Sequence, residues 1–318
     1  MTTILKLLGT RLLTGAVILT LVSIVIFASV ELAPGDPATR ILGKEAPEEQ
    51  IAVWRKTFGL DRPLTERYFQ WLGGMVTGDL GPMMRRSLQP IGEVLPGRII
   101  NSLWLAGAAM LIYVPMTLAI SILSAIFRYR YPDHVMSVTT LFILSLPVFV
   151  VGPAILVLFV LVLDLLPAVQ FIEQAESPID RAKILVLPAS ALAIGMSGHA
   201  IRMLRDNLIE VLDSDYVQMA HFKGLPLHRV VLIHALPNAI MPFLNVTALN
   251  LSFVLGGSLI IELVFSYPGL GMLLFHAIGL SDAPLIEITV LITASLFIAA
   301  NTLSDIVAIL VVPRLRTG

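Results

Sequence analysis

The sequence predicts an all-α polytopic membrane protein with six transmembrane helices. Only 14% of its 318 residues are charged, against an average of about 25% in soluble domains, and 57% are hydrophobic. The charged residues are also unevenly distributed, because residues 33–98 carry 17 of the 43. The apolar remainder exceeds what one globular core could bury, so the composition excludes an ordinary soluble enzyme.

Six charge-free apolar stretches are long enough to cross a bilayer as helices, which requires about 17–25 residues. They are Leu12–Val30, Ile99–Phe127, Val135–Leu163, Ile184–Ile201, Ala239–Ile261 and Ile288–Ser304, the last continuing past Asp305 to Val312. The first stretch follows two basic residues, as a signal peptide would, but it is longer than the apolar core of about 7–15 residues in a cleavable signal. We therefore expect a retained anchor helix.

The Lys and Arg residues of the short loops predict the orientation in the membrane. Ten lie in the termini and loops on the side of the N-terminus, whereas the short loops on the opposite side carry only Arg181 and Lys183. Because cytoplasmic loops are enriched in Lys and Arg, both termini are predicted to be cytoplasmic. The expected divisions are an anchor helix at 1–32, an external region at 33–98, a five-helix core at 99–312 that includes a cytoplasmic loop at 202–238, and a tail at 313–318.

Two helices are predicted in the external region. The first begins after Pro47, with negative charge in its first turn, and ends at Gly59. The second, roughly 64–72, places Leu64, Tyr68 and Trp71 on one face. We expect this face to pack against the outer ends of the spans, with direct ligand contact as the alternative.

The cytoplasmic loop contains a clearly delimited short helix at about 214–224. Asp215 supplies negative charge to its first turn, Lys223 supplies positive charge to its last, and Gly224 is a natural residue to end it. Tyr216, Ala220 and Gly224 recur at helical spacing, so one face would carry an aromatic side chain and two positions with almost no side chain. Such a face suits docking into a groove of a cytoplasmic partner. Lying flat on the bilayer is the alternative, but it favours a face ringed by several basic residues.

This loop resembles the cytoplasmic signature loop of ABC-importer permeases, and more narrowly that of the peptide and nickel branch. The resemblance lies in DYVQMAHFKGL at residues 215–225 and HALPNA at 234–239. Of the general signature E-A-A, three residues, G, nine residues, I-x-L-P, only Ala220, Gly224, Leu236 and Pro237 match. Further segments resemble the same branch: PGDP at 34–37, FGLDRPL at 58–64, GDLG at 78–81, SLPVF at 145–149 and ELVFSYPGLG at 262–271.

The resemblance implies the fold of a type I ABC importer permease, whose short cytoplasmic helix sits in a cleft of a separate ATPase subunit. It also implies the partners: a second similar permease subunit, two ATPase subunits and an external solute-binding protein. The expected setting is the bilayer of a bacterial or archaeal cell membrane, the inner membrane if Gram-negative. The residues it implicates in ATPase coupling are Asp215, Tyr216, Ala220, Lys223, Gly224, Leu236 and Pro237.

No catalytic residues are expected in this chain. The segment GGMVTGD at 73–79 lacks the Lys of a phosphate-binding G-x-x-x-x-G-K-[ST] motif and lies in the external region. We therefore expect the chain to bind no cofactor, with ATP and Mg²⁺ held by the partner ATPase subunits. No metal ligands stand at suitable spacing, and a net charge of −1 gives no basic field for nucleic acid.

Ser145, Asn245 and Asn250 are the candidate residues of a passage for a hydrated cargo, although ordinary hydrogen bonds between helices would equally explain them. The resemblance implies di- or oligopeptides as cargo, with nickel, glutathione or glycans as alternatives. A self-contained secondary carrier is the competing class of protein. It would require paired charges within the membrane and inverted repeats, neither of which the sequence shows.

Overall fold

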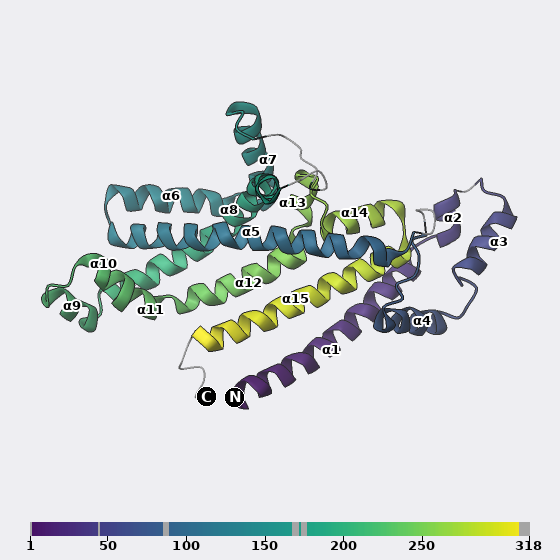
Figure 1. Cartoon of the computed structure of the whole chain (residues 1–318), viewed down its shortest axis with the longest axis horizontal. Coiled ribbons are helices and arrows are strands. Elements are labelled where there is room, and N and C mark those ends of the chain that lie inside the picture. Colours follow the sequence, from purple (N-terminus) through teal and green to yellow (C-terminus); the bar gives the residue numbers. More distant parts are fainter. Residues whose placement is uncertain (1, 44, 85–88, 167–171, 173–176, 312–318) are drawn as a thin grey trace. The chain divides into compact units, whose positions relative to one another are not determined.

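The computed structural model describes residues 2–43, 45–84, 89–166, 172 and 177–311 (Figure 1). Apart from one isolated bridge between Pro82 and Pro90, regular structure in this described part is helical. The chain forms two compact units. The first unit comprises residues 1–4, 104–267 and 300–318, and the second comprises residues 5–103 and 268–299.

The second unit contains most of the N-terminal helix and the external region. Its elements are α1 (Thr2–Glu31), α2 (Pro37–Leu42), α3 (Glu48–Thr57), α4 (Leu64–Thr77), the start of α5 (Ile91–Ile126), α14 (Leu270–Leu280) and the first part of α15 (Ala283–Val311). The predicted helices at 48–59 and 64–72 are thus present as α3 and α4. An apolar cluster that includes Ile91, Leu270 and Ile288 forms the core of this unit.

Asp36 anchors the chain where α1 gives way to α2. Its carboxylate accepts hydrogen bonds from the backbone N–H of Thr39 at 3.0 Å and from the Thr39 hydroxyl at 2.9 Å, so it caps α2. Arg55 on α3 reaches the same carboxylate at 3.3 Å. Burial by itself would raise the pKa of Asp36, but the hydrogen bonds from Thr39 and Arg55 outweigh it and lower that pKa.

Helix α4 packs on the end of α1, as its apolar face predicts. The Phe27 ring lies 5.4 Å from the Tyr68 ring and 5.9 Å from the Trp71 ring, and the Tyr68 and Ser23 hydroxyls are 2.8 Å apart. Arg67 forms a two-point ion pair with Glu31, and both side chains are largely buried. Helix α4 is therefore fixed to α1 by ring contacts, a hydrogen bond and an ion pair.

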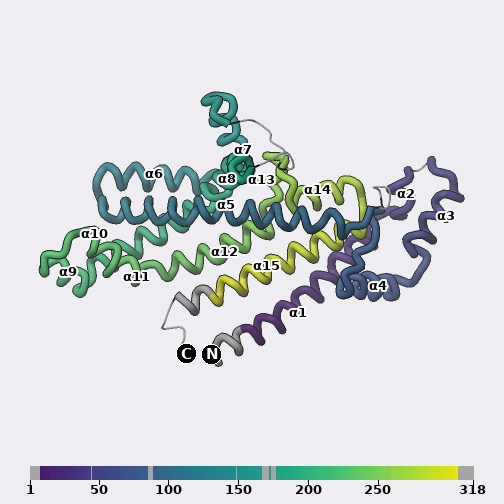
Figure 2. The backbone as a smooth tube through the Cα atoms, viewed as in Figure 1, coloured from purple at the N-terminus to yellow at the C-terminus, as the bar shows by residue number. Residues whose placement is uncertain are grey.

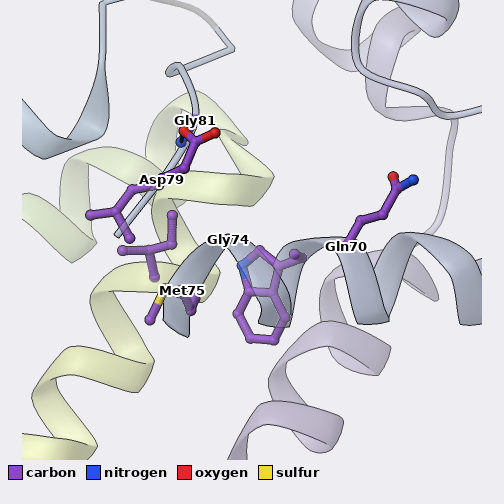
Figure 3. A pocket seen from close by; sticks show the side chains of 8 residues that line it. Gln70, Gly74, Met75, Asp79 and Gly81 are labelled. Carbon is purple, nitrogen blue, oxygen red and sulfur yellow. Dashed lines mark hydrogen bonds between the residues drawn. The ribbon is translucent and has the colours of Figure 1, made fainter. Parts of the chain in front are cut away.

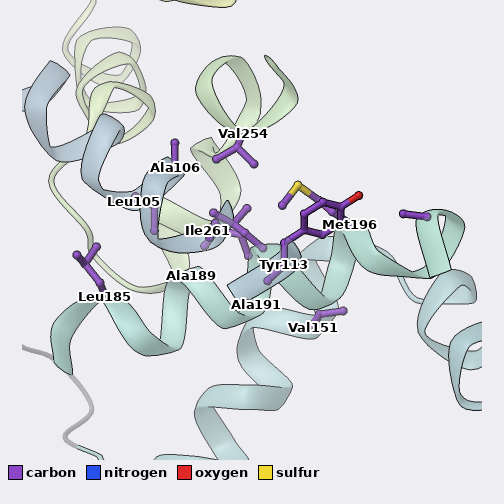
Figure 4. Close-up of a cluster of buried hydrophobic side chains, with 14 of the residues drawn as sticks. Leu105, Ala106, Tyr113, Val151, Leu185, Ala189, Ala191, Met196, Val254 and Ile261 are labelled. Carbon is purple, nitrogen blue, oxygen red and sulfur yellow. The ribbon is translucent and has the colours of Figure 1, made fainter. Parts of the chain in front are cut away.

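The first unit is built around α8 (Pro178–Leu212). Its other elements are the rest of α5, α6 (Tyr131–Ser145), α7 (Val148–Leu156), the π-helical segment η1 (Val157–Val162), α9 (Asp215–Phe222), α10 (Leu227–Arg229), the π-helical segment η3 (Val230–Ala235), α11 (Leu236–Ala239), α12 (Met241–Gly257), α13 (Leu259–Val264) and the end of α15. Two-thirds of the most apolar 18-residue stretch of α8 is buried. Ala189 and Ala191 on α8 join a cluster with Tyr113, Val254 and Ile261 (Figure 4). Small side chains on α8 allow its neighbours to approach closely.

Four helices are long and apolar enough to cross a membrane singly: α1, α5, α8 and α15. Two bent pairs bring the number to six if each counts as one span, in agreement with the predicted count. They are Tyr131–Ser145 with Phe149–Val162, bent by 113°, and Leu227–Ala239 with Met241–Gly256, bent by 62°.

The apolar stretch Val135–Leu163 is interrupted at Pro147, as expected for a proline within a span. The helix stops at Ser145, and Leu146 adopts an extended conformation with φ −85° and ψ 127°. The cause is Pro147, because a proline ring excludes the residue before it from the helical region. Similarly, the span expected at Ala239–Ile261 is divided into α12 and α13 by a break at Ser258.

Candidate functional site

The short helix expected in the cytoplasmic loop is present as α9, which directly follows α8 (Figure 2). It begins after Ser214, with Asp215 in its first turn, and ends at Phe222. Gly224 then turns the chain with a φ of +78°, a left-handed conformation that costs glycine little and other residues more. Helix α9 is thus delimited at both ends by its own sequence.

One face of α9 is buried against the same chain. Val217 is completely buried and Ala220 is 7% exposed, and both join Val230 in a small hydrophobic cluster. Ala220 is therefore covered by the chain itself, whereas Tyr216, one turn before it, is exposed. Of the three residues expected to share a docking face, Tyr216 and Gly224 are exposed and Ala220 is covered by the chain itself.

The opposite face of α9 is exposed and carries large apolar side chains. Tyr216 is 49% exposed, Met219 is 59% exposed and Phe222 is 82% exposed. Asp215 and Lys223 are also exposed. The sequence prediction omitted Met219 and Phe222, although Tyr216, Met219 and Phe222 follow one another at intervals of three residues and so form a stripe along the helix.

Leu236 and Pro237 lie at the start of α11, the short helix that follows η3. Leu236 is half-buried against the core of the first unit, whereas Pro237 is exposed. The Asn238 side chain donates a hydrogen bond to the backbone carbonyl of His234 at 2.9 Å. Leu236 and Pro237 thus lie in the connection between η3 and α12. They are not part of the exposed stripe of α9.

A surface ion pair holds the junction between α8 and α9. The guanidinium of Arg128 donates to the Asp213 carboxylate at 2.6 Å. This hydrogen bond raises the pKa of Arg128 and lowers the pKa of Asp213, so both partners are stabilised in their charged forms. Gln218 on α9 donates to the backbone carbonyl of Asp213 at 3.1 Å. Asp213 therefore connects α9, through Gln218, with the turn after α5, through Arg128.

The three candidate passage residues have different surroundings. Asn245 on α12 is exposed, and Ser145 is exposed at the end of α6 with its hydroxyl donating to the Phe142 carbonyl at 2.7 Å. Asn250 instead donates to the Tyr113 hydroxyl at 3.0 Å and to the Met196 carbonyl at 3.4 Å. The structure does not bring the three together. The alternative role, a hydrogen bond between helices, describes Asn250.

A cavity of about 240 Å³ lies in the second unit beside α4. Gln70, Gly74, Met75, Asp79 and Gly81 line it together with Trp71, Leu80 and Ile288 (Figure 3). The Asp79 carboxylate accepts a hydrogen bond from the backbone N–H of Gly81 at 3.3 Å. A Cβ atom at Gly74 would lie 2.5 Å from the Asp79 carbonyl oxygen, so glycine is needed for the chain to turn back on α4. Gln70, Trp71 and Asp79 supply the polar side chains of its lining.

Within the described ranges, no group of three or more His, Cys, Asp or Glu residues could hold a metal ion. The exposed apolar stripe on α9 and the polar residues of α6 and α12 are surfaces that suit contact with partners or with a passing solute.

Family models match nearly the whole chain. Residues 117–317 match the model described as binding-protein-dependent transport system inner membrane component, and residues 4–90 match the N-terminal model of the same kind of membrane component. The chain is 34% identical over 298 residues to the glutathione transport system permease protein GsiC of Salmonella choleraesuis, covering 94% of both chains. It is also 34% identical over 299 residues to a Brucella abortus protein provisionally named as a peptide transport system permease, covering 94% of this chain and 95% of the relative.

A solved structure shares the fold. The inward-facing MetNI methionine ABC transporter contains a chain that matches with a TM-score of 0.57 at 14% identity, covering 69% of this chain and 96% of that one. This match supports the fold, and the six apolar spans found when each bent pair is counted once agree with a multi-pass membrane protein. The family models and relatives describe permeases that work with ATPase and binding-protein partners. The chain belongs to the family of binding-protein-dependent transport system inner membrane components, the permease subunits of ABC importers.

Proposed function

We propose that the chain forms half of the translocation pathway for di- or oligopeptides and is driven by separate ATPase subunits that bind α9. A second, similar permease subunit would supply the other half of the pathway. An external solute-binding protein would deliver the cargo, and ATP with Mg²⁺ would bind only to the ATPases.

The observation that carries this proposal is the exposed stripe on α9, formed by Tyr216, Met219 and Phe222. A helix that buries one apolar face in its own chain and exposes another carries more apolar surface than a monomer requires. Protein interfaces are enriched in aromatic side chains and methionine at their centres. Asp215 and Lys223, which flank the stripe, would supply polar contacts at its edge.

The pathway residues are proposed with the roles that their positions allow. Ser145 and Asn245 present polar groups on exposed surfaces of α6 and α12, so they suit contact with a hydrated cargo. Asn250, which is bonded to Tyr113, would stabilise the packing of α12 instead. Leu236 and Pro237 would act by setting the direction in which the chain leaves the α9 region.

The cargo class is proposed from the relatives. One curated relative is named for glutathione, which is itself a tripeptide, and another is provisionally named for peptides. The sequence segments that resemble the peptide and nickel branch support the same class. Identifying the molecules that co-purify with the cognate binding protein would test it, and a glycan or a nickel complex as the bound ligand would contradict it.

The test of coupling is the Phe222→Ala substitution. Phe222 is 82% exposed, so its removal should leave the fold intact while the ATPase subunit is lost during co-purification from membranes. Tyr131→Ala is the matched control, because Tyr131 is also an aromatic residue with 82% exposure and lies on α6. Equal ATPase recovery with both variants would contradict the assignment of α9 as the contact.

A further inference from the structure

A buried ion pair fastens the turn between α5 and α6 to α8. Asp133, in the first turn of α6, is 3% exposed. Its carboxylate accepts hydrogen bonds from Ser124 at 2.5 Å, the backbone N–H of Tyr129 at 2.9 Å and Ser137 at 3.3 Å. Arg205 of α8 donates to both of its oxygens, with Nε and Nη2 each at 2.7 Å. One carboxylate thus joins α5, the turn, α6 and α8.

Arg205 is equally committed to this junction. Its side chain is 18% exposed, and Nε also lies 3.1 Å from the Ser124 hydroxyl. Only Nη1 points to the surface, where it donates to the exposed Asp206 at 2.8 Å. A guanidinium that meets a carboxylate through two parallel bonds fixes orientation as well as distance, which a lysine could not do.

Two further contacts join the same elements on either side of this pair. The Ser121 hydroxyl of α5 donates to the Ile201 carbonyl of α8 at 3.1 Å, and Arg128 of the turn bonds Asp213 at 2.6 Å. Together with Arg205, these points cover about 18 Å of α8 at 1.5 Å per residue. A junction fixed at three levels resists sliding and rotation, whereas a single contact would act as a pivot.

The end of α8 that carries these contacts leads directly into α9. Val217 and Ala220 of α9 pack in one cluster with Val211 and Leu212 at the end of α8, and Gln218 bonds back to the Asp213 carbonyl. A displacement of α9 is therefore passed first to the end of α8. Because α8 is fastened to the turn after α5, the α5–α6 hairpin would follow.

We propose that Asp133 and Arg205 are positioning residues that make α9, the end of α8 and the α5–α6 turn move as one body. The proposal rests on the proposed function, in which an ATPase displaces α9. The pair makes its contacts within the chain, with α5, the turn after it, α6 and α8. Its role is to convert a displacement of the cytoplasmic helix into a displacement of helices that cross the membrane.

The test is the ratio of ATP hydrolysed to cargo imported by the complete importer in proteoliposomes. Asp133→Asn keeps the shape of the side chain but removes the charge that holds Arg205, and Arg205→Lys keeps the charge but removes the two-point geometry. Both variants should retain most of the ATPase rate while cargo import falls, so the ratio should rise about five-fold or more. Asp206→Asn is the matched control, because it removes the same negative charge from the exposed partner of Arg205 and should leave the ratio unchanged.

A parallel fall in ATPase and import, or an unchanged ratio in both variants, would overturn the positioning role. This outcome is distinguishable from failure of the proposed function, in which the wild-type importer itself would show no ATP-driven import.

A distance measurement in a chain that keeps Asp133 and Arg205 tests the proposal even if these variants fail to assemble. The chain contains no cysteine, so spin labels can be placed at Tyr131→Cys on α6 and Glu210→Cys on α8, both exposed positions. With partner subunits free of reactive cysteine, the distance between the labels should stay constant between the ATP-free and ATP-bound importer. A distance that changes between these two states would show that α6 and α8 move separately and would overturn the proposal.

Discussion

At the scale of single residues, two largely buried ion pairs lie at junctions between elements. Arg67 meets Glu31 where α4 lies on α1, and Arg205 meets Asp133 where α8 lies on the α5–α6 turn. A charge taken out of water is costly unless a partner and hydrogen bonds compensate it. These pairs therefore specify which elements meet.

Removing one member of a buried pair should be far more damaging than removing an exposed one. Arg67→Met would leave the Glu31 carboxylate, with a side chain only 8% exposed, without its partner. We expect a loss of about 3–5 kcal/mol in stability, measured as a lower thermal unfolding temperature of the purified protein.

Arg62→Met is the control for this measurement. Arg62 pairs with Glu66, and the two side chains are 51% and 50% exposed. Exposed pairs contribute about 0–1 kcal/mol, so this variant should unfold close to the wild-type temperature. Equal losses in the two variants would contradict the importance given to burial.

The Arg128–Asp213 pair predicts a dependence on pH. The hydrogen bond from Arg128 holds the pKa of Asp213 below its ordinary value of 3.8, so the pair stabilises the fold above that value. This stability is lost as the pH falls through the lowered pKa. Unfolding temperatures measured between about pH 6 and about pH 3 should therefore converge for wild type and Asp213→Asn at the acidic end.

Glu210→Gln is the control, since Glu210 is exposed on α8 and its removal breaks no ion pair of the described structure. Its unfolding temperature should follow the wild type throughout the range. A gap between wild type and Asp213→Asn that stays constant with pH would show that the pair contributes no pH-dependent stability.

Sequence alone could not determine the orientation of α9 or the buried pairs. The repeat of Tyr216, Ala220 and Gly224 is compatible with a docking face, but the inward face is selected by Val230, which comes from the segment after the helix. Likewise, Asp133 and Arg205 are far apart in sequence, and nothing local indicates that they meet. Periodicity defines the faces of a helix, whereas tertiary packing decides which face is covered.

At the scale of elements, the sequence predicts helix ends better than helix continuity. The limits of α9 follow from Asp215 and Gly224, which act within the helix itself. The bend between α6 and α7 falls at Pro147, a residue that predicts a kink, whereas the break between α12 and α13 at Ser258 has no such signal in the sequence. Composition signals that a segment can lie in lipid, while the backbone restriction before a proline decides whether it stays one helix.

The contact between α6 and α8 depends on a glycine. A Cβ atom at Gly198 would lie 3.3 Å from the Cβ and Cδ1 atoms of Leu144, so a larger side chain must push the two helices apart. Gly198→Leu should lower stability by about 1–3 kcal/mol, measured by thermal unfolding in detergent.

Gly107→Leu is the control for that contact. Gly107 is exposed on α5, and an added Cβ atom would meet nothing within 4 Å. We expect this variant to unfold at or above the wild-type temperature, since glycine inside a helix is itself unfavourable. Equal destabilisation by both substitutions would show that close packing at Gly198 is unimportant.

At the scale of the whole molecule, the chain is a membrane permease whose exposed α9 stripe is available to another subunit. The low content of charged residues already distinguishes the chain from soluble enzymes. The sequence segments that resemble the peptide and nickel branch, taken in order along the chain, predict the family that the comparisons show. Cargo is less accessible to sequence reasoning. A passage that must release its solute needs only weak polar contacts, and such contacts resemble ordinary hydrogen bonds between helices.

The most direct test of the central claim is ATP-driven peptide import by the complete importer in proteoliposomes. We predict import with the wild-type permease and both ATPase subunits. When Tyr216, Met219 and Phe222 are all replaced by alanine, the import rate should fall at least about ten-fold, which corresponds to about 1.4 kcal/mol or more. The variant permease should still be recovered folded in the membrane. Import at the wild-type rate by that variant, or ATP-driven import by the permease without ATPase subunits, would contradict the account.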